Sequence, residues 1–272
     1  MTAMRVVDGF WARARELGRV VGDGVVDSGQ AVLYLRQLFR GNHGPPASPR
    51  QAPAGAAPGL SARAAAGPAP ATPPPVLLIH GYLATRGSVH LLESRLAARG
   101  SVVITYRLGP IHLGDIHDSA GFIARKIESL AAQTGVDKVD VVAHSMGGLV
   151  ALDYLKRLGG ERRIRRLVLL GTPTAGTWSA LLGIVIAPLG RASLQLLPGS
   201  AFLRELGERP MPAGPEVMAV AAGRDWLAPP RTTRLEGVRH LVVPTGHSGL
   251  LVDESVAQTV ADILAAPTVT NA

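Results

Sequence analysis

The sequence predicts an α/β fold: a mostly parallel six-stranded sheet with helices on both faces and a helical cap insertion. Three observations predict it. Short apolar runs alternate with longer segments of helical periodicity between residues 75 and 265. Several of these runs are almost free of polar residues, as expected of strands covered on both faces of a parallel sheet. Polar or glycine-rich turns follow the runs, at the strand ends where ligands bind in such sheets.

Six apolar runs are the predicted strands, and turn residues bound each of them. They cover residues 76–80, 102–106, 139–143, 167–170, 217–222 and 240–243. Between them, apolar side chains recur at helical spacing over residues 89–98, 116–133 and 249–265, and after Ser145. Asp115 is the expected N-cap of the second helix, and Gly135 ends it.

Residues 174–209 interrupt this alternation and are predicted to form a helical cap over a substrate pocket. The segment carries too much apolar surface for a solvated loop. Pro188 and Pro198 divide it into shorter pieces. A mobile lid and an ordinary helix pair packed on the sheet are both compatible with this pattern.

The N-terminal part of the chain differs from the rest in composition. Residues 1–41 have helical periodicity and are predicted to be an amphipathic segment that either lies on a membrane surface or packs on the folded domain. Its basic residues include Arg13, Arg15, Arg19, Arg36 and Arg40. Residues 42–74 are dominated by Pro and Ala, so we expect a disordered linker. Residues 75–272 are then the folded domain.

Composition narrows the function classes. The 272 residues include no cysteine, which excludes disulfides, thiolate-bound zinc and thiol catalysis. The formal net charge is +8, and one basic cluster follows the helix after Ser145. It consists of Lys156, Arg157, Arg162, Arg163, Arg165 and Arg166. We interpret it as a solvated surface and expect no nucleic-acid partner, because few aromatic side chains lie among these residues.

No secretory signal and no run of about 18 apolar residues is visible. The longest uncharged apolar stretch, from Trp178 to Gly190, is too short and contains a proline. We therefore expect a cytoplasmic protein or one held at the membrane periphery.

The stretch from Val139 to Val150 carries the clearest chemical signal. It predicts a buried strand, a sharp turn at Ser145 and a helix, with small residues two positions either side of the serine, at Ala143 and Gly147. Such a turn exposes the serine hydroxyl, and the N–H of Met146 could stabilise an oxyanion beside it. The alternative is a serine that merely caps a helix.

A serine nucleophile needs a base and a carboxylate that orients it. Asp225 and His247 follow the last two predicted strands, which gives the order serine, acid, histidine. His240 lies within a strand pattern, and His144 is too close to the serine in the chain to fold back onto it. The other candidates for the base or for the carboxylate are less well placed in the chain. They are His112, His117, Glu216, Glu236 and Asp253.

The loop after the first strand should supply the second oxyanion donor, the N–H of Tyr82, because Gly81 lets the backbone approach closely. We also expect substrate contacts from residues near these loops. They are His80, Gly81, His144, Trp178 and Trp226.

Five parts of the sequence together resemble small bacterial triacylglycerol lipases and esterases of the α/β-hydrolase fold. They are His80-Gly81-Tyr82, Ala143-His144-Ser145-Met146-Gly147-Gly148, Gly171-Thr172-Pro173, and the loops around Asp225 and His247. The resemblance covers residues 75–265, with Ala143 in place of the usual first glycine of the elbow. The two leading antiparallel strands of larger hydrolases have no counterpart.

This resemblance implies a serine hydrolase that cleaves carboxylic esters, above all lipid acyl esters, through an acyl-enzyme and without a cofactor. It also allows a structural calcium ion, for which the sequence shows no ligand cluster. Two alternatives stay open. One is an acyltransferase that uses the same triad, and the other is a non-catalytic membrane- or partner-binding protein on this fold.

Overall fold

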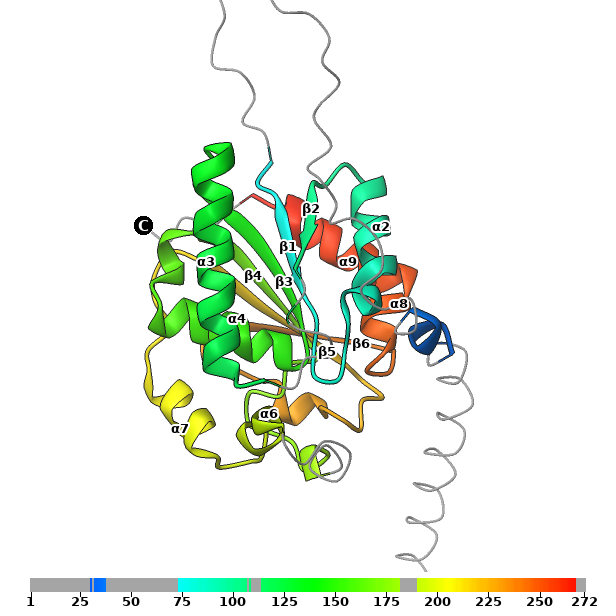
Figure 1. Cartoon of the computed structure of the whole chain (residues 1–272). Helices are drawn as coiled ribbons and strands as arrows, with labels where there is room; N and C mark the ends of the chain where they lie inside the picture. Colours follow the sequence, from blue (N-terminus) through cyan, green and yellow to red (C-terminus); the bar gives the residue numbers. More distant parts are fainter. Residues whose placement is uncertain are drawn as a thin grey trace, which may run out of the picture.

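The computed structural model describes residues 30, 32–37, 73–106, 108, 114–181 and 190–267. Most of the predicted linker, most of the N-terminal arginines and His112 lie outside these residues. In the described part, six strands form one sheet in the order β2-β1-β3-β4-β5-β6, and every neighbouring pair is parallel (Figure 1). The strands are β1 (Val76–Ile79), β2 (Val103–Thr105), β3 (Val139–His144), β4 (Ile164–Leu170), β5 (Glu216–Ala222) and β6 (Arg239–Val243). The predicted fold class is confirmed.

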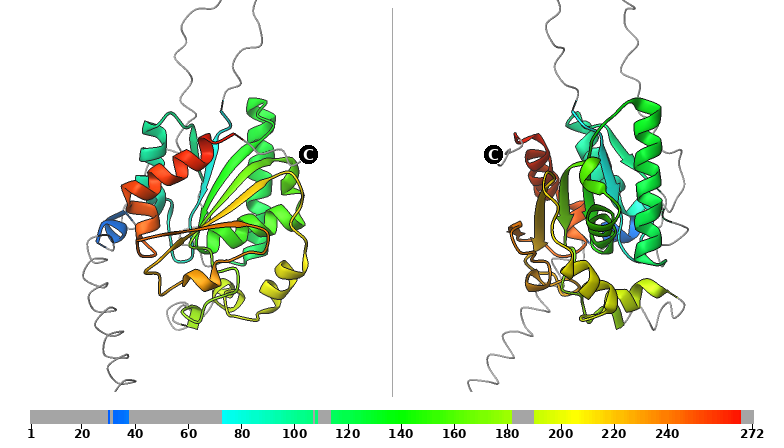
Figure 2. Two further views of the ribbon diagram at one scale, coloured as in Figure 1. Left: turned by 180° about the vertical axis from the view of Figure 1, so that it is seen from behind. Right: turned by 90° about the vertical axis from the view of Figure 1, so that its left-hand side faces the viewer.

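Helices cover both faces of this sheet, as Figures 1 and 2 show. One layer contains α3 (Ile116–Thr134) and α4 (Met146–Arg157), and the other contains α2 (His90–Ala98), α8 (Gly249–Val252) and α9 (Glu254–Ala265). The shorter helices are α6 (Arg191–Gln195), α7 (Ala201–Glu208), and the 3-10 turns η1 (Arg86–Val89), η2 (Gly160–Arg162) and η3 (Pro230–Thr232). Residues 30 and 32–37 are also helical and lie beside α8.

The alternation of side chains along the strands builds two hydrophobic cores. In β1, Leu77 and Ile79 belong to the core under α3 and α4, whereas Val76 and Leu78 belong to the core under α2 and α9. Successive residues of a strand point to opposite faces, so an uninterrupted apolar run is what a sheet with helices on both faces requires.

Helix ends explain one success and one error of the sequence analysis. The Asp115 carboxylate accepts the His117 N–H at 2.8 Å, and Gly135 ends α3 with a φ of 71°, as expected. The single helix predicted over residues 249–265 was wrong. Asp253 is extended there and its carboxylate accepts the Ser255 N–H at 2.9 Å, so it separates α8 from α9 as the N-cap of α9.

The described part of the predicted cap packs against the main domain. Phe202, Leu203 and Leu206 of α7 are buried in the same core as α3 and α4. The Lys156 ammonium donates to the carbonyl oxygens of Leu206 and Arg209 at 3.1 and 2.9 Å. These contacts are those of a packed helix. Residues 182–189 lie outside the described residues, so a mobile lid stays a prediction.

The interpretation of the basic cluster as a solvated surface was wrong for Arg166, whose side chain is fully buried. Its guanidinium donates from Nε to Glu216 at 2.9 Å and from Nη1 and Nη2 to the carbonyl oxygens of Leu264 and Ala266 at 2.8 and 3.1 Å. Because β4 lies inside the sheet, its side chains are covered, and a cation there needs these partners. Arg166 therefore joins β4, β5 and the end of α9.

We expect Arg166→Met to lower the free energy of unfolding by about 3 kcal/mol, because it leaves Glu216 and the Ala266 carbonyl without their donor and removes one of the two donors to the Leu264 carbonyl. Arg163→Met is the matched control, since Arg163 pairs with Glu128 and Asp137 at the surface and its loss should change little. Urea unfolding of the two variants and the wild type measures both. Equal stability of the two variants would contradict the structural role of Arg166.

His80 is buried at the end of β1, and burial lowers its pKa to about 4. Between this value and the ordinary pKa of 6.5, the unfolded chain binds more protons than the folded one. Stability should therefore be lost as the pH falls below 6.5.

We expect this single group to account for a loss of about 2 kcal/mol between pH 7 and pH 5, so His80→Gln should reduce the loss by that amount. The control is His90→Gln, because the His90 side chain is 47% exposed. Urea midpoints of wild type and His80→Gln at the two pH values test this expectation. It fails if both proteins lose the same stability between pH 7 and pH 5.

Candidate active site

Ser145 occupies a strained turn between β3 and α4. Its φ of 54° and ψ of −127° are unfavourable for a residue with a side chain, and such strain persists only where the surrounding structure imposes it. Here the Ser145 N–H donates to the Leu170 carbonyl at 2.8 Å, and the Gly148 N–H donates to the Ser145 carbonyl at 3.0 Å. The turn is therefore held by both the sheet and the helix that follows it.

Glycines allow the neighbouring loops to approach this turn. A Cβ atom on Gly147 would lie 2.6 Å from the His80 carbonyl oxygen, and one on Gly81 would lie 2.9 Å from the Cβ of Ser145. Gly148 is equally constrained, because its Cβ would lie 1.9 Å from the Thr172 hydroxyl oxygen. The backbone after β1 thus reaches the serine only because these side chains are missing.

His247 and Asp225 form a short polar contact at this edge of the sheet. The Nδ1 atom of the imidazole lies 2.6 Å from Oδ2 of the carboxylate. The other carboxylate oxygen accepts the N–H groups of Leu227 and Ala228 at 2.9 and 2.8 Å. The Asp225 side chain is fully buried, so both of its oxygens are fixed and the ring orientation of His247 is fixed with them.

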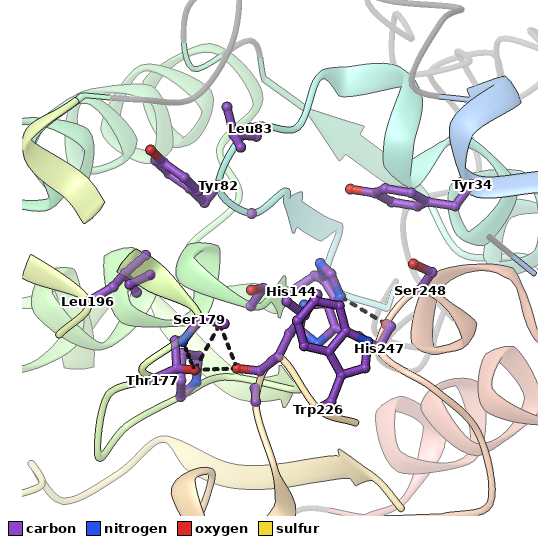
Figure 3. Close-up of a pocket in the computed structure, with 16 residues that line it drawn as sticks. Tyr34, Tyr82, Leu83, His144, Thr177, Ser179, Leu196, Trp226, His247 and Ser248 are labelled. Carbon is purple, nitrogen blue, oxygen red and sulfur yellow. Dashed lines mark hydrogen bonds between the residues drawn. The ribbon is translucent and has the colours of Figure 1, made fainter. Parts of the chain in front are cut away.

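A mostly apolar cavity of about 370 Å³ lies in front of these residues (Figure 3). Its lining contains Gly81, Tyr82, Leu83, His144, Ser145, Pro173, Thr177, Ser179, Ala180, Leu196, Trp226, Leu227, Ala228, His247 and Ser248, and also Tyr34 from the N-terminal helix. Size, apolar lining and a few convergent polar groups are typical of a small-molecule site.

The structure brings most of the residues predicted from the sequence to this cavity, but not all of them. The cavity is lined by six of them: Gly81, Tyr82, His144, Ser145, Trp226 and His247. Asp225 lies behind His247, and His80 and Met146 are buried and do not line the cavity. Trp178 is 68% exposed and lines a neighbouring pocket with Trp226.

The rival residues are engaged elsewhere. His240 Nε2 lies 2.9 Å from the Thr233 hydroxyl, and His117 Nδ1 lies 3.0 Å from the Asp153 carboxylate. Glu216 pairs with Arg166, and Asp253 caps α9. Neither these residues nor Glu236 line the cavity.

His144 is a neutral neighbour of His247. Burial, and next the proximity of His247, hold the pKa of His144 well below its ordinary value. Its Nε2 lies 3.3 Å from the His247 carbonyl oxygen, which can only accept, and the two rings are 4.6 Å apart. An uncharged His144 can therefore donate to the backbone of His247 and support its position.

Several lining residues have no signal in the sequence. Leu83 has a φ of 53°, which only the fold reveals, and it follows the loop of Gly81 and Tyr82. Ser179 reaches the cavity because its hydroxyl donates to the Leu227 carbonyl at 3.1 Å, which ties the start of the cap segment to the loop of Asp225. Leu227 and Ala228 could have been included with Trp226, since they follow the predicted acid directly in the chain.

In the described ranges, no three His, Asp or Glu side chains are grouped so that they could hold a metal ion. No helix within those ranges combines the length and apolar character that crossing a membrane requires.

Comparisons with known proteins agree with this fold. Residues 76–270 match the model of the alpha/beta hydrolase family. A mature lipase from Bacillus licheniformis superimposes with a TM-score of 0.60 at 18% identity, over 71% of this chain and 92% of that one. A thermophilic esterase from Thermogutta terrifontis gives 0.51 at 19%, over 71% and 90%.

Lipase B from Aspergillus fumigatus gives a TM-score of 0.62 at 17% identity, over 71% of this chain but only 53% of that one, so this chain spans about half of its length. At such identities the solved structures show a shared fold. The family model, in contrast, matches well over half of the chain. The chain therefore belongs to the alpha/beta hydrolase family.

Proposed function

We propose that this protein is a serine hydrolase that cleaves carboxylic esters, with lipid acyl esters as its substrate class. The observation that carries the proposal is the contact of 2.6 Å between His247 and the buried Asp225, at a cavity that the strained Ser145 also lines. A nucleophile, a base and a fixed carboxylate in this relation are the parts of a catalytic triad.

In the proposed reaction, the Ser145 hydroxyl attacks the ester carbonyl while His247 accepts its proton on Nε2. Asp225 holds Nδ1 and stabilises the imidazolium that forms. The N–H groups of Tyr82 and Met146 donate to the oxyanion, and Met146 is suited to this because the first N–H groups of a helix have no partner within it. His247 then protonates the leaving alcohol, and water releases the acyl group from Ser145 by the reverse steps.

Two features support lipid esters in particular. The cavity is mostly apolar, and four large apolar side chains are exposed in the segments around it. They are Trp178, Leu181, Leu194 and Trp226. Exposed apolar groups gathered near one site are typical of contact with apolar partners. An acyltransferase would use the same groups with another alcohol in place of water, and contact of residues 1–41 with a membrane stays a prediction.

We expect a fluorophosphonate probe to label Ser145, because the probe traps an activated serine next to its base. Ser145→Ala should abolish both labelling and hydrolysis of esters of graded chain length. Peptide mapping of the labelled protein identifies the site. Labelling or turnover that survives Ser145→Ala would refute the assignment.

A second test separates the two histidines near the last strand. His247→Ala should reduce kcat by roughly a thousandfold or more, as loss of a triad member does. His240→Ala is the matched control and should keep kcat, because His240 bonds to Thr233 and does not line the cavity. Steady-state kinetics on a soluble ester measures both, and the opposite pattern would make His240 the base.

A further inference from the structure

The helix of residues 30 and 32–37 is attached to the loop that carries His247. The Gln30 side chain accepts from the Thr245 hydroxyl at 3.1 Å and donates to the Asp253 carboxylate at 3.3 Å. These bonds join residues that are 215 and 223 positions apart in the chain. Thr245 is buried and lies two residues before His247, so Gln30 holds one end of the histidine loop.

The other end of the same helix is attached to α2. Gln37 is buried, and its side-chain oxygen accepts the N–H of Leu91 at 2.9 Å. Leu91 lies in the first turn of α2, where Val89 provides no side-chain cap. Gln37 therefore supplies the acceptor that the N-terminus of this helix lacks in its own segment.

The fit at Gln30 leaves no room for an extra methyl group. A Cβ atom on Gly249 would lie 1.9 Å from the Thr245 hydroxyl oxygen and 2.5 Å from the Gln30 side-chain oxygen. The glycine at the start of α8 thus allows the N-terminal helix to dock.

Between these two anchors, Tyr34 reaches the active-site cavity. Its ring extends from the N-terminal helix into the space above Ser248, as Figure 3 shows, and it lines the cavity. The hydroxyl is hydrogen-bonded to Ser88, and burial raises the pKa of Tyr34 to about 12. Ser88 is itself fixed, because it donates to the Thr85 carbonyl at 2.7 Å. The aromatic ring is thus held at its base by the helix and at its tip by η1.

We propose that the helix of residues 30 and 32–37 forms a wall of the active-site cavity and that Tyr34 is a specificity-determining residue, which limits the size of the ester groups that fit beside His247 and Ser248. The inference rests on the proposed ester hydrolysis and adds to it the part of the chain that shapes the pocket. Of the two alternatives for residues 1–41, the described part packs on the folded domain.

Substitutions in the full-length chain test this wall. We compare kcat/KM for a laurate ester with kcat/KM for an acetate ester of the same alcohol. Tyr34→Ala should raise the ratio of the two values by about tenfold, because the size of an apolar pocket discriminates between substrates at this level. Tyr34→Phe keeps the ring and should keep the wild-type ratio. Leu35→Ala is the control on the same helix, because Leu35 is exposed and does not line the cavity.

The anchor provides an independent variant. Gln30→Ala removes the bonds to Thr245 and Asp253, so it should shift the ratio in the same direction as Tyr34→Ala. An unchanged ratio in Tyr34→Ala, or an equal change for both esters, would overturn the proposal.

The proposed function and the wall can fail separately. If the protein cleaves esters and is labelled at Ser145, but the ratio of the two kcat/KM values is the same in wild type and Tyr34→Ala, only the proposal about Tyr34 is refuted. If no ester is cleaved, calorimetric binding of lauryl and butyl alcohol to wild type and Tyr34→Ala replaces the kinetic readout. The proposal about Tyr34 then requires the ratio of the two Kd values to differ by about the same tenfold between wild type and Tyr34→Ala. Equal ratios in the two proteins overturn it.

Discussion

The active site depends on one local constraint, the strained turn at Ser145. A side chain is held at a φ of 54° because a hydrogen bond to β4 fixes one side of the turn and α4 fixes the other. This is feasible only where glycines let the loop after β1 and the start of α4 come into backbone contact. Any added methyl group at Gly81 or Gly147 would push the candidate oxyanion donors away from the serine. The turn therefore sets the distance between the proposed nucleophile and the proposed oxyanion donors.

Around this turn, each further group is positioned by a neighbour that does not itself react. Asp225 is held by two backbone N–H groups of its own loop, and it holds His247. His144 stays uncharged next to His247 because it is buried, and its ring lies close to that of His247. Precision at the base therefore comes from buried hydrogen bonds, which is how rigid elements support catalytic groups.

Much of this arrangement could be predicted from the sequence, because it follows local rules. Apolar runs predicted the six parallel strands, and the small residues around Ser145 predicted the turn. Asp225 and His247 were found because parallel strands end at one edge of a sheet. Arg166, Leu83 and Tyr34 were missed for a common reason. A buried cation, a positive φ and a distant wall residue depend on contacts between segments far apart in the chain, which no periodicity records.

The bonds of Gln30 have a consequence for the order in which the molecule is completed. Synthesis runs from the N-terminus, and domains fold as their segments emerge. The N-terminal helix emerges early, but its partners Thr245 and Asp253 follow 215 and 223 residues later. Its docking must wait for almost the whole chain, as must the contact between Asp225 and His247. A nascent chain thus holds Ser145 long before it holds the proposed base His247 or a finished pocket, so the completed site arises only when synthesis is nearly over.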